Sequence, residues 1–148
     1  MSLSDKLKDA MKQAMRDKDK LRLGTIRMAL AAIKQIEIDE RVTLDDDGII
    51  KVLTKLVKQR KDSVQQYTDA NRPELAEAEA AEIEVLKDFL PQALTEQEIA
   101  ELIDSAITEL GATGMQDMGK VMGKLKPVMQ GRADMSVVSG IIKARLSN

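Results

Sequence analysis

The residues with the clearest chemistry in this 148-residue chain are lysines and arginines near its C-terminus. From Gly111 onward the chain carries six basic and two acidic residues, a local net charge of +4, whereas the whole chain sums to −2. Gly119 and Gly131 would let another backbone approach this segment closely. A positive helical module with glycines in it is typical of a phosphate-binding surface. The candidate contacts are Lys120, Lys124, Lys126, Arg132, Lys143 and Arg145. The alternative is that these side chains only keep the helices soluble.

Other residue types exclude several kinds of site. The chain has no cysteine and no histidine, which excludes disulfides, thiol nucleophiles and the usual zinc sites. No P-loop, nucleophile elbow or zinc-protease motif occurs. Gly119 and Gly123 have a spacing like that of a phosphate loop, but they fall inside a predicted helix. We therefore predict no catalytic residue, no cofactor and no metal, and the sequence leaves open whether the chain is an enzyme.

Two groups of carboxylates have plain structural interpretations. The acids at positions 77, 79, 82 and 84 fit a solvated helix face, because nothing nearby would raise a pKa for acid–base chemistry. Asp45, Asp46 and Asp47 point in different directions if they begin a helix, so they cannot share one metal ion. We interpret them as charges that stabilise a helix N-terminus. The cations Lys58, Arg60 and Lys61 form a weaker candidate patch for an anionic ligand.

Apolar residues recur every three or four positions and never alternate with period two, so we predict an all-α protein. The expected helices span about residues 4–18, 19–41, 43–67, 73–90, 96–110, 117–127 and 134–146. Pro91 separates a four-helix N-terminal domain, residues 1–90, from a three-helix C-terminal domain, residues 91–148.

Local signals fix several helix ends. Thr43 and Thr95 each begin a capping-box pattern, and Asp134 is a candidate N-cap. Gly111 is expected to end its helix with a positive φ angle, and Pro127 is expected to disrupt the helix that contains it. Residues 91–110 contain five acids and no base, so we expect the C-terminal domain to present negative and positive charge on separate faces.

Several motifs carry a family resemblance. The run DMGKVMGKLKP ending at Pro127, the run GRAD ending at Asp134 and the pair Val137–Val138 resemble the signature of the GatB/YqeY family. The resemblance extends upstream through residues 58–63 and 83–91, and the length matches the free-standing YqeY-like members. The sequence departs from the family pattern at Met135 and Ser139.

The resemblance implies a function. The family includes the tail of the B subunit of glutamine-dependent aminoacyl-tRNA amidotransferases, which helps to hold tRNA. It therefore implies a non-catalytic tRNA-binding accessory factor, with tRNA and an amidotransferase or another translation protein as partners. The competing class is a protein-interaction module without RNA binding, which an exposed groove of Met115, Met118, Met122 and Met129 would favour. No apolar run long enough for a membrane span occurs, so we expect a cytoplasmic protein that does not bind membranes. The oligomeric state stays open.

Overall fold

The computed structural model describes residues 2–147, and within that range it contains helices and no strand. The all-α prediction is confirmed. The chain divides into two compact units, residues 1–90 and residues 91–148, hereafter unit 1 and unit 2. None of the described helices combines the length and the apolarity that a membrane span requires.

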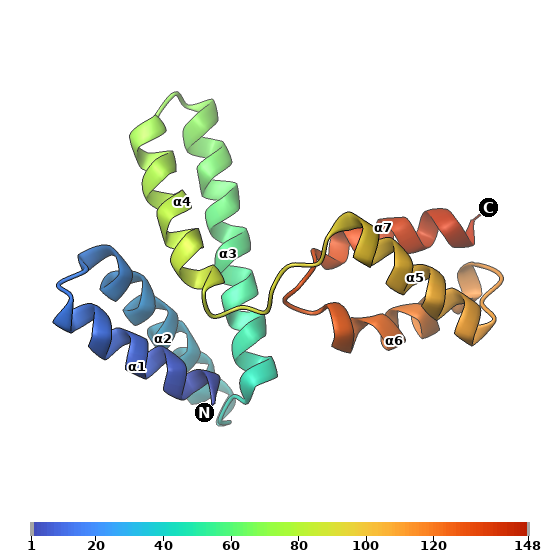
Figure 1. The fold of residues 1–148 in the computed structure, drawn as a ribbon, viewed down its shortest axis with the longest axis horizontal. Coiled ribbons are helices and arrows are strands. Elements are labelled where there is room, and N and C mark those ends of the chain that lie inside the picture. Colours follow the sequence, from blue (N-terminus) through green and yellow to red (C-terminus); the bar gives the residue numbers. More distant parts are fainter. Residues whose placement is uncertain (1, 148) are drawn as a thin grey trace. The chain divides into compact units, whose positions relative to one another are not determined.

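Unit 1 consists of two helical hairpins, coloured blue to yellow-green in Figure 1. The first hairpin contains α1, Leu3–Arg16, and α2, Lys20–Glu40. The second contains α3, Asp46–Asp69, and α4, Pro73–Lys87, which pack along one another. Its core is aliphatic and takes side chains from all four helices, as expected for stripes that repeat every three or four residues. The most deeply buried large side chains are Leu7, Ile26, Ile49, Leu53 and Leu86.

The start of α3 is fixed by contacts that the sequence pattern did not show. The predicted N-cap, Thr43, is wrong, because Asp45 occupies that position and accepts a hydrogen bond from the Gly48 N–H at 2.8 Å. The next residue, Asp46, accepts the N–H of Leu3 in the first turn of α1 at 2.9 Å. A single carboxylate thus ties the N-terminal ends of α1 and α3 together. It satisfies a donor that has no partner within its own helix.

Two other sequence predictions for unit 1 need correction. Met15 was expected in the buried stripe of α1, but it is 50% exposed because it lies at the end of the helix, next to the α1–α2 turn. The fourth helix was expected to reach residue 90, but α4 ends at Lys87, and backbone turns carry the chain through Phe89 and Leu90. Both of those residues still pack against the core of unit 1.

Unit 2 is a small three-helix bundle. It contains α5, Glu96–Leu110, the short 3-10 helix η1, Met115–Asp117, then α6, Met118–Met129, and α7, Met135–Leu146. All three α-helices contribute to one core. Its buried members are Ile103, Ala106, Val121, Leu125, Met129, Val138, Ile142 and Leu146.

Most of the helix-end predictions for unit 2 are confirmed. Thr95 forms a complete capping box with Glu98, Gly111 ends α5 with φ 62°, and Asp134 caps α7. The prediction for Pro127 is wrong, because α6 continues through it to Met129. A proline in the last turn removes a single hydrogen bond, so the helix tolerates it there better than in its middle.

Three glycines lie inside the helices of unit 2 without a packing reason in the unit itself. A Cβ atom added at Gly119, Gly123 or Gly140 would meet no atom within 4 Å. Glycine inside a helix is less favourable than alanine, because it loses more backbone entropy on folding.

Replacing Gly123 and Gly140 with alanine is therefore expected to stabilise unit 2 by about 0.5–1 kcal/mol for each substitution. Chemical denaturation of the purified variants measures this change. The matched control is Gly111→Ala, which is expected to destabilise the unit because φ 62° is a left-handed conformation that alanine disfavours. Stabilisation by the control, or destabilisation by the two helix substitutions, would show that this account of the glycines is wrong.

Candidate functional site

Two of the cations predicted to contact phosphate are paired within unit 2. The ammonium group of Lys124 on α6 forms an ion pair with Glu109 on α5, and the Arg145 guanidinium on α7 forms one with Asp104, also on α5. The acidic helix and the two basic helices therefore neutralise part of one another's charge. The two ion pairs bring opposite charges together where α5 meets α6 and α7, and the expectation of separate charged faces stays a prediction for the remaining side chains.

A third candidate, Arg132, has a structural role. Its Nε–H donates to the Gln92 carbonyl at 2.9 Å, and its own carbonyl accepts the Leu94 N–H at 2.8 Å. These bonds hold the segment before α5 against the loop before α7. Nearby, the Thr95 backbone N–H lowers the pKa of Glu98, with smaller contributions in the same direction from the Thr95 hydroxyl and from Arg132.

The remaining predicted site residues are dispersed over α6, α7 and the loop between them. Lys120, Lys126 and Lys143 are exposed, and none of them forms an ion pair within residues 2–147. Gly119 lies on an open part of α6, and Gly131 adopts φ 78° in the α6–α7 loop. Among the described residues, three of the six predicted cations thus form neither an ion pair nor a side-chain hydrogen bond, and the predicted set is spread over two helices and the loop between them.

The four methionines of the alternative groove do not all lie on the surface. Met115 is exposed, but Met118 and Met122 are only partly accessible and Met129 is completely buried in the core of unit 2. Met129 therefore fills space between helices, which is a common use of this flexible side chain.

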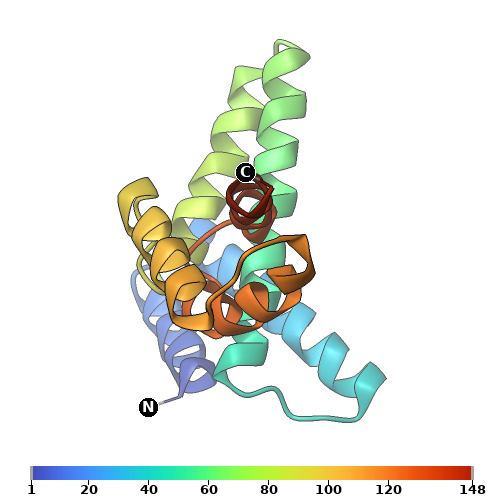
Figure 2. The same ribbon diagram turned by 90° about the vertical axis from the view of Figure 1, so that its right-hand side faces the viewer.

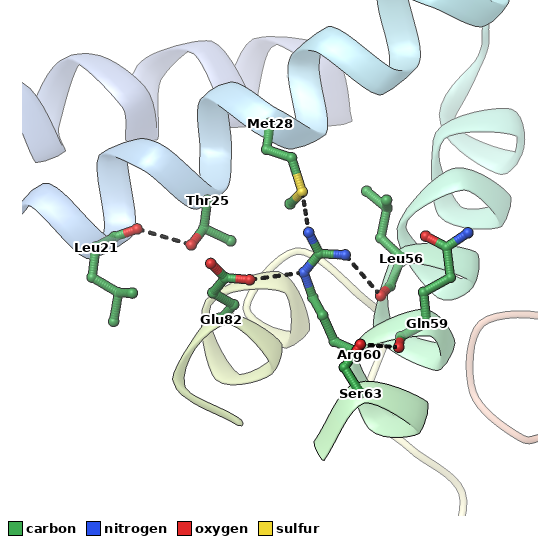
Figure 3. Close-up of polar contacts among 8 residues, drawn as sticks. All are labelled: Leu21, Thr25, Met28, Leu56, Gln59, Arg60, Ser63 and Glu82. Atoms are coloured by element: carbon green, nitrogen blue, oxygen red, sulfur yellow. Dashed lines mark hydrogen bonds and ion pairs between the residues drawn. The ribbon is translucent and has the colours of Figure 1, made fainter. Parts of the chain in front are cut away.

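In the candidate anion patch on α3, the central residue, Arg60, is bonded to other parts of unit 1. Figure 3 shows the Arg60 guanidinium where α2, α3 and α4 meet. Its Nε–H donates to Glu82 on α4 at 3.0 Å, a second N–H donates to the Leu56 carbonyl at 3.3 Å, and a third contacts the Met28 sulfur on α2. The Arg60 side chain is only 16% exposed, so it joins three helices and is not available to a ligand. Lys58 and Lys61 remain exposed.

A different surface, in unit 1, was not recognised from the sequence. Figure 2 shows the end of α2 projecting outward and the following loop returning to the start of α3. Beneath this loop lies an open hollow of about 560 Å³. We call it the α2–α3 hollow; it is lined by Ser2, Ser4, Glu37, Thr43, Leu44, Asp45, Asp46 and Asp47.

Two exposed aliphatic residues are next in the chain to residues that line the α2–α3 hollow, although neither is among its lining residues. Ile38, next to Glu37 in the chain, is 60% exposed, and Val42, next to Thr43, is 45% exposed. The only sequence signal was that Ile38 falls outside the helical stripe to which its neighbours Ile33 and Ile36 belong. An apolar residue out of phase at a helix end is easily discounted, because single exposed aliphatic residues are common.

Comparison with known proteins identifies the family. The model of the family described as "Yqey-like protein" matches residues 4–146, nearly the whole chain. The chain belongs to this family. The resemblance stated from the sequence motifs to free-standing YqeY-like proteins is therefore confirmed.

Several curated relatives of this YqeY-like protein are fungal proteins with one shared name, "Altered inheritance of mitochondria protein 41, mitochondrial". The Lachancea thermotolerans protein is 41% identical over 107 residues, covering 70% of this chain and 57% of the relative. The Kluyveromyces lactis protein is 35% identical over 142 residues, covering 93% and 72%. The Vanderwaltozyma polyspora protein is 33% identical over 150 residues, covering 96% and 80%.

These relatives correct two predictions. Their shared name refers to the inheritance of mitochondria and to neither tRNA nor an amidotransferase, so the predicted role as a tRNA-binding amidotransferase accessory factor is contradicted. The same names place the relatives in mitochondria, which contradicts the cytoplasmic prediction. The physical reason for the first error lies in unit 2, where charges counted as free are paired within the bundle.

Proposed function

We propose that this YqeY-like protein acts in mitochondria, in the inheritance of the organelle, by binding another protein. The setting is supported by the similarity to the Kluyveromyces lactis protein, which extends over 93% of the chain and so includes both units. The mode of action is an inference from the surface of unit 1.

Protein binding is inferred from the α2–α3 hollow and from two exposed aliphatic residues that are next to its lining residues in the chain. Ile38 and Val42 expose apolar surface that no other part of unit 1 covers. Covering such surface is favourable by about 25 cal/mol for each Å² removed from water. Protein interfaces combine apolar and polar groups. This surface offers both, because exposed aliphatic side chains neighbour a hollow that is lined mostly by polar residues.

A complementation experiment tests this function. The chain, fused to a mitochondrial targeting segment, is expressed in a Kluyveromyces lactis strain that lacks its own relative, and the inheritance of mitochondria by daughter cells is scored. We expect the unaltered chain to restore normal inheritance. The Ile38→Ser/Val42→Ser variant is expected to lose most of this rescue, because it removes the apolar surface that a partner would cover.

The matched control is Met15→Ser/Leu21→Ser, which removes two side chains of similar exposure, 50% and 45%, at the α1–α2 turn. This control is expected to retain rescue. If the unaltered chain is present in mitochondria at normal levels and restores nothing, the proposed function is wrong. If both double variants rescue equally well, the function stands without the α2–α3 hollow.

A further inference from the structure

We propose that the partner segment that occupies the α2–α3 hollow is basic and carries aliphatic residues, with its lysines or arginines directed at the hollow and its aliphatic side chains on Ile38 and Val42. This inference rests on the proposed function and specifies the chemistry of the partner. Its argument combines the apolar surface, the shape of the hollow and the charge around it.

The chain segment that supplies most of the lining of the hollow is strongly acidic. Residues 37–47 contain six acids and one base, which leaves a local charge of −5. None of these six acids forms an ion pair within residues 2–147. Arginines elsewhere in unit 1 do pair, since Arg22 bonds to Asp88 at 2.7 Å and Arg60 to Glu82 at 3.0 Å. Unit 1 therefore forms ion pairs elsewhere, whereas this segment keeps a net negative charge whose acids form no ion pair within the described residues.

Three of the carboxylates are held in place before any partner arrives. One oxygen of Glu37 accepts the Leu44 N–H at 2.8 Å, one of Asp45 accepts the Gly48 N–H at 2.8 Å, and one of Asp46 accepts the Leu3 N–H at 2.9 Å. Each carboxylate keeps a second oxygen that can accept bonds from an ammonium or guanidinium group. Because the backbone already orders these side chains, a partner loses less conformational entropy on binding than it would with mobile ones.

The apolar neighbours distinguish a protein segment from a simple cation. A small cation would gain nothing from contact with the apolar side chains of Ile38 and Val42. A peptide that alternates basic and aliphatic side chains can contact the carboxylates and the aliphatic groups together. Nucleic acids and anionic lipid surfaces would be repelled by a surface of this charge. Complementary charge also speeds the encounter and selects against acidic segments.

A peptide titration tests the inference. The probe is a fluorescent 16-residue amphipathic peptide with lysine on one face and leucine on the other. Two matched peptides replace either every lysine with glutamine or every leucine with serine. We expect the full chain to bind the first peptide at least tenfold more tightly than either matched peptide, with an affinity that falls as salt increases.

Variants of the chain locate the binding surface. Glu40→Gln/Asp47→Asn removes two exposed charges that make no cap bond, and it is expected to weaken binding about three- to tenfold, in line with the strength of exposed charge pairs. Ile38→Ser/Val42→Ser is expected to weaken it about tenfold or more. The control Asp62→Asn/Glu77→Gln removes two exposed acids from the middle of α3 and from α4, and it is expected to leave binding unchanged.

Equal weakening by the control and by the variants of the hollow would overturn the inference, as would equal binding of all three peptides. Circular dichroism confirms that each variant is folded before its affinity is compared. The outcome is independent of the rescue experiment. Failure to rescue with selective peptide binding intact overturns the proposed function alone, and rescue without peptide selectivity overturns the inference alone.

Discussion

Replacing Ile142 with alanine is expected to destabilise unit 2 strongly and to leave the stability of unit 1 unchanged. Ile142 is completely buried in the core of unit 2, and a substitution of this kind costs about 2–5 kcal/mol. A unit of 58 residues has a total stability of only about 3–9 kcal/mol at typical values per residue. The substitution thus removes a large part of the stability of the unit. The cores of units 1 and 2 share no residue, so the loss should remain local.

Hydrogen exchange with mass spectrometry measures this effect helix by helix. Loss of protection confined to α5, α6 and α7 is the expected result. The control is Val137→Ala in the same helix, where a 54% exposed side chain leaves no cavity, and it is expected to change protection little. Simultaneous loss of protection in α1–α4 would contradict the independence of the two cores.

The helices of unit 2 could be predicted from the sequence because their signals are local. Thr95 and Glu98 stand three residues apart and form the two reciprocal bonds of the capping box, so the local sequence specifies the start of α5. The start of α3 is different. Several residues there can cap a helix, and the contacts around the start of α3 come from outside the capping pattern. Glu37 at the end of α2 binds Leu44, and the N-terminus of α1, which is 43 residues away in the chain, binds Asp46.

The candidate site was harder to predict, because counting charged residues does not show which of them form ion pairs with one another. Lys124 lies 15 residues from Glu109 and Arg145 lies 41 residues from Asp104, so their pairing depends on how the helices are rotated against one another. The α2–α3 hollow depends likewise on the path of a loop, and the single residue that marks it, Ile38, looks like ordinary exposed surface in a sequence.

The same reasoning leads to a second prediction, for Arg60. The predicted patch for an anionic ligand treated this arginine as free, whereas in the structure its three donor groups reach α2, α3 and α4. Replacing Arg60 with alanine is expected to destabilise unit 1 by about 1–3 kcal/mol, because Glu82 loses its charged partner and the alkyl stem no longer packs between the helices. Equilibrium denaturation followed by circular dichroism gives this value.

Two further variants separate the contributions to the Arg60 effect. Lys61→Ala removes the neighbouring exposed cation and is expected to change stability by less than about 0.5 kcal/mol, so a comparable loss there would contradict a specific role for Arg60. Glu82→Gln completes a double-mutant cycle, which isolates the Arg60–Glu82 coupling from the packing of the arginine stem. A Glu82 side chain that is 32% exposed is partly solvated, so the coupling should be the smaller part. The larger part then comes from the stem and from the bond to the Leu56 carbonyl, which identifies Arg60 as a structural connection between three helices.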